Sequence, residues 1–113
     1  SVVMSVPAYA GTWKYVNDQW KYQRGANKFA YKEWIQDNGN WYYMDNNGVM
    51  TTGWQQIDGQ WYYFDAEGYM ATGWIELDGK SYYLDPSTGA MYANTRTPDN
   101  CWVDESGVWI PGM

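Results

Sequence analysis

Residues 54–65 read WQQIDGQWYYFD, and near-copies of this stretch lie on either side of it: WIQDNGNWYYMD at residues 34–45 and WIELDGKSYYLD at residues 74–85. The tryptophans that open the three copies, Trp34, Trp54 and Trp74, are twenty residues apart. Self-similarity at a short, fixed period is typical of repeat architectures, in which each unit packs only against its neighbours. The sequence therefore predicts a repeat array.

Each copy has the pattern of one β-hairpin. Asp58-Gly59 and Asp78-Gly79 suit a two-residue type I′ turn, because both central residues of that turn need a positive φ. The aromatic run that follows, such as residues 61–64, is typical of a strand. An isolated hairpin is only marginally stable in water, so the units must stack. We expect an all-β solenoid of stacked β-hairpins, with about four hairpin repeats and a C-terminal cap, and not a propeller, whose blades need about forty residues.

The organisation along the chain follows from how well each part keeps the pattern. We expect a divergent, basic N-terminal repeat at 11–33 and three regular repeats at 34–53, 54–73 and 74–94. A C-terminal cap is expected at 95–113, where Trp102 and Trp109 remain but the hairpin pattern is lost. Atypical ends are expected in a solenoid, because they close its core.

Residues 1–10 differ from the rest of the chain. They are uncharged, mildly apolar and end in Ala8-Tyr9-Ala10. A small residue on either side of one other residue, after an apolar stretch, is typical of a signal-peptide cleavage site. We interpret them as a signal-peptide remnant, although an ordinary first strand is the alternative. The protein is then secreted, and no stretch is long enough to span a membrane.

Composition excludes several classes of function. A net charge of −6 argues against a nucleic-acid binder, which would need lysine and arginine to neutralise phosphates. The absence of histidine excludes Ser/His/Asp and Cys/His catalysis, and Cys101 is the only cysteine. Asp45, Asp65 and Asp85 recur once per unit, as expected of turn residues that bond to nearby backbone amides. We expect no enzyme activity, no cofactor and no metal site.

The aromatic side chains are the candidates for function. The chain has nine tryptophans and twelve tyrosines, and we expect the first tyrosine of each aromatic run, Tyr42, Tyr62 and Tyr82, to lie in the core. The other rings share the opposite face of each hairpin, so stacking should leave a three-sided aromatic box at each junction. Such a box attracts a quaternary ammonium through cation–π interactions of about 0.5 to 2 kcal/mol per contact.

Several motifs resemble the choline-binding, or cell-wall-binding, repeats of bacterial surface proteins. They are Gly53-Trp54, the run Trp61-Tyr62-Tyr63-Phe64-Asp65, Gly68-Tyr69-Met70 and Ala71-Thr72-Gly73-Trp74. The resemblance implies a left-handed superhelix of hairpins located at the bacterial cell surface. It also implies that choline, or the phosphocholine of cell-wall teichoic acid, binds between successive hairpins.

The resemblance implies specific site residues. One site would comprise Trp34, Trp41, Met50 and Tyr63, a second Trp54, Trp61, Met70 and Tyr83, and a weaker third Trp13, Trp20 and Tyr43. The box opened by Trp74 would lack its second ring because Ser81 replaces a tryptophan. We expect that box to be empty or filled by Trp102.

Two other functions stay open at this point. Rings can stack on sugars, and Asn and Gln side chains lie beside them, so the array could instead be a carbohydrate-binding module. It could also be a structural spacer or adhesion stalk whose rings are only core. The exposed hairpin edges could, in addition, pair two chains into a homodimer.

Overall fold

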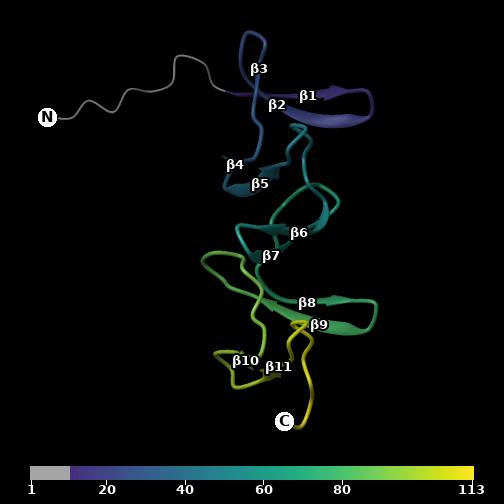
Figure 1. The fold of residues 1–113 in the computed structure, drawn as a ribbon, viewed down its shortest axis with the longest axis vertical. Helices are drawn as coiled ribbons and strands as arrows, with labels where there is room; N and C mark the ends of the chain where they lie inside the picture. Colours follow the sequence, from purple (N-terminus) through teal and green to yellow (C-terminus); the bar gives the residue numbers. More distant parts are fainter. Residues whose placement is uncertain (1–10) are drawn as a thin grey trace, which may run out of the picture. The chain divides into compact units, whose positions relative to one another are not determined.

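A computed structural model describes residues 11–113 of the chain, and the predicted signal-peptide remnant at 1–10 lies outside the described residues. Within the described part every regular element is a β-strand, so the all-β prediction is confirmed (Figure 1). No helix in this part is long and apolar enough to cross a membrane. The chain divides into two compact units, of which the first ends at Thr51 and the second is Thr52–Met113.

The first unit contains two sheets. A three-stranded sheet has the order β1-β2-β3, and a separate hairpin is formed by β4 and β5, all pairs being antiparallel. The strands are β1 (Thr12–Val16), β2 (Gln19–Gly25), β3 (Lys28–Phe29), β4 (Glu33–Asp37) and β5 (Asn40–Met44). The divergent N-terminal repeat is therefore a hairpin with a third strand added to it.

The second unit contains three antiparallel hairpins. The strands are β6 (Gly53–Ile57), β7 (Gln60–Phe64), β8 (Gly73–Leu77), β9 (Lys80–Leu84), β10 (Thr95–Arg96) and β11 (Trp102–Val103). The last pair was not expected, because residues 95–113 lack the repeat's hairpin pattern. The cap is thus a shortened hairpin.

The predicted turns are confirmed. Asp58 has φ 50° and Gly59 has φ 83°, and Asp78 and Gly79 have φ 51° and 78°. These are the two positive values that a type I′ turn requires.

The repeated aspartates close the loop after each hairpin, as expected. Asp45 Oδ1 accepts hydrogen bonds from the backbone N–H groups of Asn47 and Val49, at 2.8 and 2.9 Å. Asp65, Asp85 and Asp104 make the corresponding bonds in their own loops. The two loop N–H groups hold the pKa of Asp85 below its usual range. One carboxylate thus fixes each loop by satisfying two of its amides.

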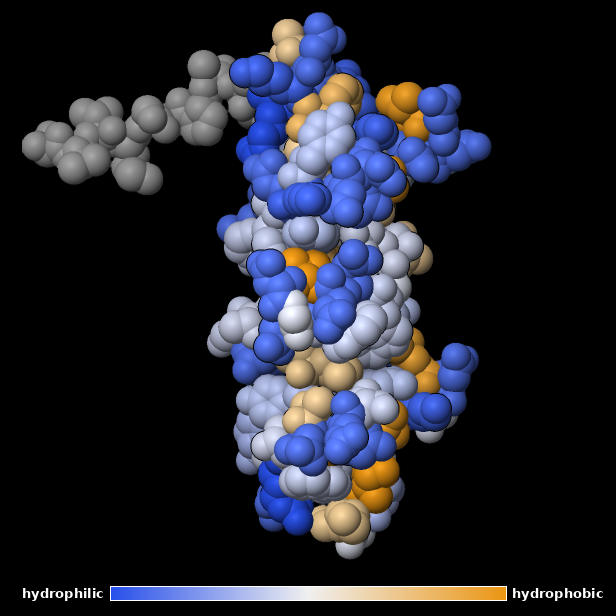
Figure 2. Space-filling model, viewed as in Figure 1, coloured by the Kyte–Doolittle hydropathy of each residue, from blue (hydrophilic) through white to orange (hydrophobic). Residues whose placement is uncertain are grey.

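The core is thin and is built at the end of each second strand. Met44, Phe64, Leu84 and Val103 occupy the same position in successive repeats, and each is fully buried. Each pairs through an isolated antiparallel bridge with a residue six or seven positions later, as Phe64 does with Met70. On the face shown in Figure 2, strongly hydrophobic colour is confined to small separate areas. The large side chains that remain exposed are mainly aromatic.

Candidate functional site

One face of the β6–β7 hairpin carries aromatic rings that the sequence predicts for a binding site. Trp54 lies directly opposite Tyr63, and Gln56 directly opposite Trp61, so these side chains point to the same side. The ring centroids of Trp54 and Trp61 are 6.5 Å apart, with the planes at 83°. Tyr62, one residue along, points to the other face.

The next hairpin closes a cavity over this face. Tyr82 of β9 packs edge-on against Trp54, with centroids 4.9 Å apart. The N–H of Met91 donates to the carbonyl oxygen of Trp61 at 2.8 Å, which fixes Met91 beside that ring. The cavity has a volume of about 410 Å³, and its lining consists of Trp54, Trp61, Tyr82, Met91, Glu105 and Ser106. Three rings, a thioether and a carboxylate therefore surround one space.

Two members of the set predicted for this site lie elsewhere. Tyr83 points to the face opposite Tyr82, where its ring packs on Trp74 at 5.1 Å and on Tyr92 at 5.0 Å. Met70 packs instead against the loop that contains Gly89. Tyr82 and Met91 line this cavity, because stacking brings the other face of the next hairpin, and that hairpin's own methionine, onto Trp54 and Trp61.

Tyr82 lies outside the core because of the face of β9 on which it stands. We expected Tyr82 to be core, yet it is only half-buried and lines the cavity. The period-two alternation of a strand places Tyr82 and Tyr83 on opposite faces. That signal could have identified Tyr82 once it was known which face meets the preceding hairpin.

The first unit repeats the arrangement. Trp13 packs against Tyr42 with centroids 4.7 Å apart, and its Nε1–H donates to Asp37 Oδ2 at 3.0 Å. The N–H of Met50 donates to the carbonyl oxygen of Trp20 at 2.9 Å, as Met91 does to Trp61. Of the weaker predicted site, Trp13 and Trp20 are therefore in matching positions. The third predicted ring, Tyr43, packs on Trp34 instead, and Tyr42 takes its place beside Trp13.

The hairpin opened by Trp34 has the same pair of tryptophans. Trp34 and Trp41 are 6.3 Å apart at 84°, nearly identical to Trp54 and Trp61. Met50, predicted for this site, is bonded through its backbone N–H to the carbonyl oxygen of Trp20, and its membership stays a prediction. Tyr63, also predicted here, belongs to the second unit and packs on Trp54 at 5.2 Å, so its membership stays a prediction.

The second-strand tryptophans share an unusual exposure. Trp20, Trp41 and Trp61 are 42%, 40% and 41% exposed. A ring held by fixed neighbours yet 40% open to solvent can receive a ligand on its free face. The equal values show that the repeat presents this ring in the same way each time.

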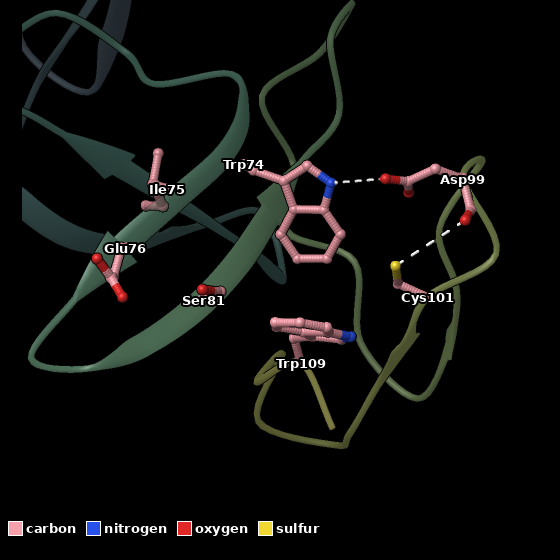
Figure 3. A pocket seen from close by; sticks show the side chains of 7 residues that line it. All are labelled: Trp74, Ile75, Glu76, Ser81, Asp99, Cys101 and Trp109. Carbon is pink, nitrogen blue, oxygen red and sulfur yellow. Dashed lines mark hydrogen bonds between the residues drawn. The ribbon is translucent and has the colours of Figure 1, made fainter. Parts of the chain in front are cut away.

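A larger cavity, of about 460 Å³, lies beside Trp74 (Figure 3). It is lined by Trp74, Ile75, Glu76, Ser81, Asp99, Cys101 and Trp109. Trp109 lies 6.1 Å from Trp74, ring to ring. We expected this space to be empty or filled by Trp102; Trp102 does not line it and lies under the guanidinium of Arg96 at 5.9 Å.

Asp99 is the carboxylate on the cap side of this cavity. Its Oδ1 accepts the hydroxyl hydrogen of Thr97, and its Oδ2 accepts the Nε1–H of Trp74 at 3.0 Å. These two donors hold the pKa of Asp99 below its usual range. Asp99 is therefore ionised at neutral pH.

A third cavity, of about 300 Å³, also borders Trp54. Its lining is Trp54, Tyr63, Leu77, Asp78, Lys80 and Tyr82. Ring faces and charged groups meet there. In the described part of the chain, no three His, Cys, Asp or Glu side chains gather as metal ligands.

Comparison with known proteins gives matches over most of the chain. The family model of the choline-binding repeat matches residues 51–95, and that of the cell wall binding repeat matches residues 32–50. No curated protein matches the chain.

Solved structures provide closer comparisons. The structure of choline binding protein F from Streptococcus pneumoniae, obtained in the presence of a peptidoglycan analogue, is 39% identical with a TM-score of 0.78, over 89% of this chain and 33% of that one. The choline binding domain of Spr1274 from the same species is 40% identical with a TM-score of 0.62, over 68% of this chain and 92% of that one. The modular Cpl-1 endolysin, complexed with a peptidoglycan analogue, is 34% identical with a TM-score of 0.69, over 97% of this chain and 33% of that one. The chain thus spans about a third of the length of two of these proteins.

Proposed function

Because this chain belongs to the choline-binding repeat family, we propose that it is a non-catalytic module that attaches to the bacterial cell wall by binding choline. The ligand is the choline headgroup, free or as the phosphocholine of teichoic acid. The cavity formed by Trp54, Trp61 and Tyr82 is the observation that carries the proposal. Attachment to the wall places the protein at the cell surface, outside the cytoplasm.

The chemistry of this cavity suits a quaternary ammonium. Such a cation has no N–H group, so it loses little when rings replace its water, and it gains cation–π attraction from each ring face. Met91 adds a polarisable surface that fits the methyl groups. Glu105 adds a negative charge at the same cavity, which favours a cation further.

Two choline sites are proposed, each contained within one unit. The site of the second unit comprises Trp54, Trp61, Tyr82 and Met91. The site of the first unit comprises Trp13, Trp20, Tyr42 and Met50. The pair Trp34 and Trp41 is proposed as part of a further site, because its geometry matches that of Trp54 and Trp61.

The test is calorimetry and thermal melting during a choline titration. We expect saturable binding and a rising Tm, because a ligand that binds only the folded state stabilises it. Trp61→Ala should remove one site from the measured stoichiometry. Gln56→Ala, which changes the residue directly opposite Trp61, should leave the stoichiometry unchanged. Unaltered choline binding in Trp61→Ala would contradict the assignment.

A carbohydrate-binding module is the second candidate function. The cavity of about 300 Å³, which Asp78 and Lys80 help to line, favours this function. Rings with charged hydrogen-bonding groups at their edges are suited to sugars. Glucose oligomers and a peptidoglycan fragment serve as parallel titrants. A response to sugars alone would support this function, and no response to any titrant would support the spacer or stalk.

A further inference from the structure

The cavity beside Trp74 differs from the cavity beside Trp54 at matching positions. Ser81 occupies the position of Trp61 in its hairpin. The N–H of Trp109 donates to the carbonyl oxygen of Ser81 at 2.8 Å, so Trp109 stands where Met91 stands in the other cavity.

Cys101 occupies the position that Tyr82 holds in the Trp54 cavity. Leu84 and Val103 form equivalent bridges, to Met91 and Trp109 respectively. Cys101 lies two residues before Val103, as Tyr82 lies two before Leu84. Of the three rings around the Trp54 cavity, only Trp54 has an aromatic counterpart in the second cavity, which is Trp74. Trp109 adds one new ring.

Hydrogen-bond acceptors replace the lost rings. Glu76 lies directly opposite Ser81, at the position that Gln56 holds opposite Trp61. Glu76 is exposed, and within residues 11–113 its carboxylate makes no hydrogen bond or ion pair. With ionised Asp99 on the other side, the cavity has two carboxylates and a serine hydroxyl, and no lysine or arginine lines it (Figure 3).

Because hydrogen-bond acceptors stand where the other cavity has rings, we propose that the Trp74 cavity is a separate site for a protonated primary amine. A primary ammonium is strongly hydrated and carries three N–H donors, so it binds where acceptors replace its water. Glu76 and the Ser81 hydroxyl provide those acceptors. Trp74 and Trp109 pack on the carbon body that carries the amine, and Asp99 adds negative charge.

The same chemistry discriminates against choline at this cavity. A quaternary ammonium donates no hydrogen bond, so it would cover Glu76 and Ser81 without satisfying them. Two rings also provide fewer cation–π contacts than three. The inference goes beyond the proposed function and does not rest on it, since the two cavities select different cations.

Cys101 provides a direct readout, because it is the only thiol and it lines this cavity. The rate of its alkylation by iodoacetamide is measured by mass spectrometry with ethanolamine or choline present. These probes differ only in three N-methyl groups. Ethanolamine should slow alkylation in a saturable way, and choline at equal concentration should not. Alkylation of free glutathione in the same solutions corrects for direct effects on the reagent.

Two variants test whether the protection of Cys101 from alkylation depends on Glu76. Glu76→Gln keeps the size of the side chain and removes its charge, and should weaken ethanolamine protection by at least about tenfold. Gln56→Ala, the matched position in the preceding hairpin, should not alter it. Equal protection by both probes, protection by neither, or full protection in Glu76→Gln would each overturn the inference. If the wild-type protein did not bind choline at the Trp54 cavity but ethanolamine still protected Cys101, the proposed function would be contradicted and this inference would stand.

Discussion

Tyr82 and Tyr83 are neighbours in β9 with different surroundings, and this difference gives a sharp test. Tyr82 lines the Trp54 cavity, whereas Tyr83 is 9% exposed and packs on Trp74 and Tyr92. Tyr82→Leu should weaken choline binding at that site by about 3- to 30-fold, the loss of one cation–π contact. Tyr83→Leu should leave the affinity nearly unchanged but lower the free energy of unfolding by about 1 to 3 kcal/mol.

Calorimetry and urea unfolding separate the two effects, with the wild type as the reference. A larger affinity loss in Tyr83→Leu than in Tyr82→Leu would return the site to the set predicted from sequence.

Of the side chains that line the Trp54 cavity, the two tryptophans could be predicted from sequence, but Tyr82 and Met91 could not. Trp54 and Trp61 follow from the repeat and from strand pairing within one hairpin, which are local features. Tyr82 and Met91 come from the next hairpin, and their place depends on which of its faces is stacked against Trp54. The motif alone does not determine that choice, so the cavity lining differs from the predicted set by one residue at the tyrosine and by one repeat at the methionine.

Three loops that follow hairpins combine a fixed aspartate with a glycine packed against the preceding repeat, and these glycines are Gly48, Gly89 and Gly107. Gly89 has φ 80° and is buried, and a Cβ at this position would clash with Met70 Sδ. Gly79, in a hairpin turn, has φ 78° but open space around it. The two glycines therefore share the backbone strain that alanine would add and differ only in packing.

Gly89→Ala should therefore lower the free energy of unfolding more than Gly79→Ala does. We expect Gly79→Ala to lower the free energy of unfolding by about 1 kcal/mol, because of the left-handed φ alone. Gly89→Ala should lower it by about 1 to 3 kcal/mol more, because the added methyl group displaces Met70. Urea denaturation of both variants measures the difference. Equal losses would show that Met70 adjusts without cost.

The short hairpin of β10 and β11 could not be predicted from the sequence. The regular hairpins are marked by an Asn-Gly or Asp-Gly turn with aromatic flanks, and each was predicted. Thr95–Arg96 and Trp102–Val103 are joined by a longer loop, in which Thr97 Oγ1 accepts the N–H of Cys101 at 3.1 Å. A strand pair held by such a loop carries no two-residue turn signal.

At the scale of the whole molecule, charge is divided between the two units. Residues 11–51 contain five basic and four acidic side chains, whereas Thr52–Met113 contains two basic and nine acidic ones. The basic charge includes Lys14 and Lys21, which lie directly opposite each other where the next hairpin buries Ile35 and Tyr42. Like charges in opposing positions disfavour stacking of another aromatic hairpin on that face, as expected of a capping repeat.

The two proposed sites in one chain should together bind a multivalent polymer far more strongly than either binds free choline. Once one site holds a choline-decorated polymer, the second binding event is intramolecular and occurs at a high effective concentration. Trp20→Ala or Trp61→Ala should therefore leave the remaining site's affinity for free choline within about twofold, yet raise the dissociation rate from a choline-bearing surface by at least about tenfold. Surface plasmon resonance on surfaces of high and low choline density measures this, and Gln56→Ala is the control. If each variant lost retention only in proportion to the site removed, the sites would act independently and attachment would rest on single-site affinity.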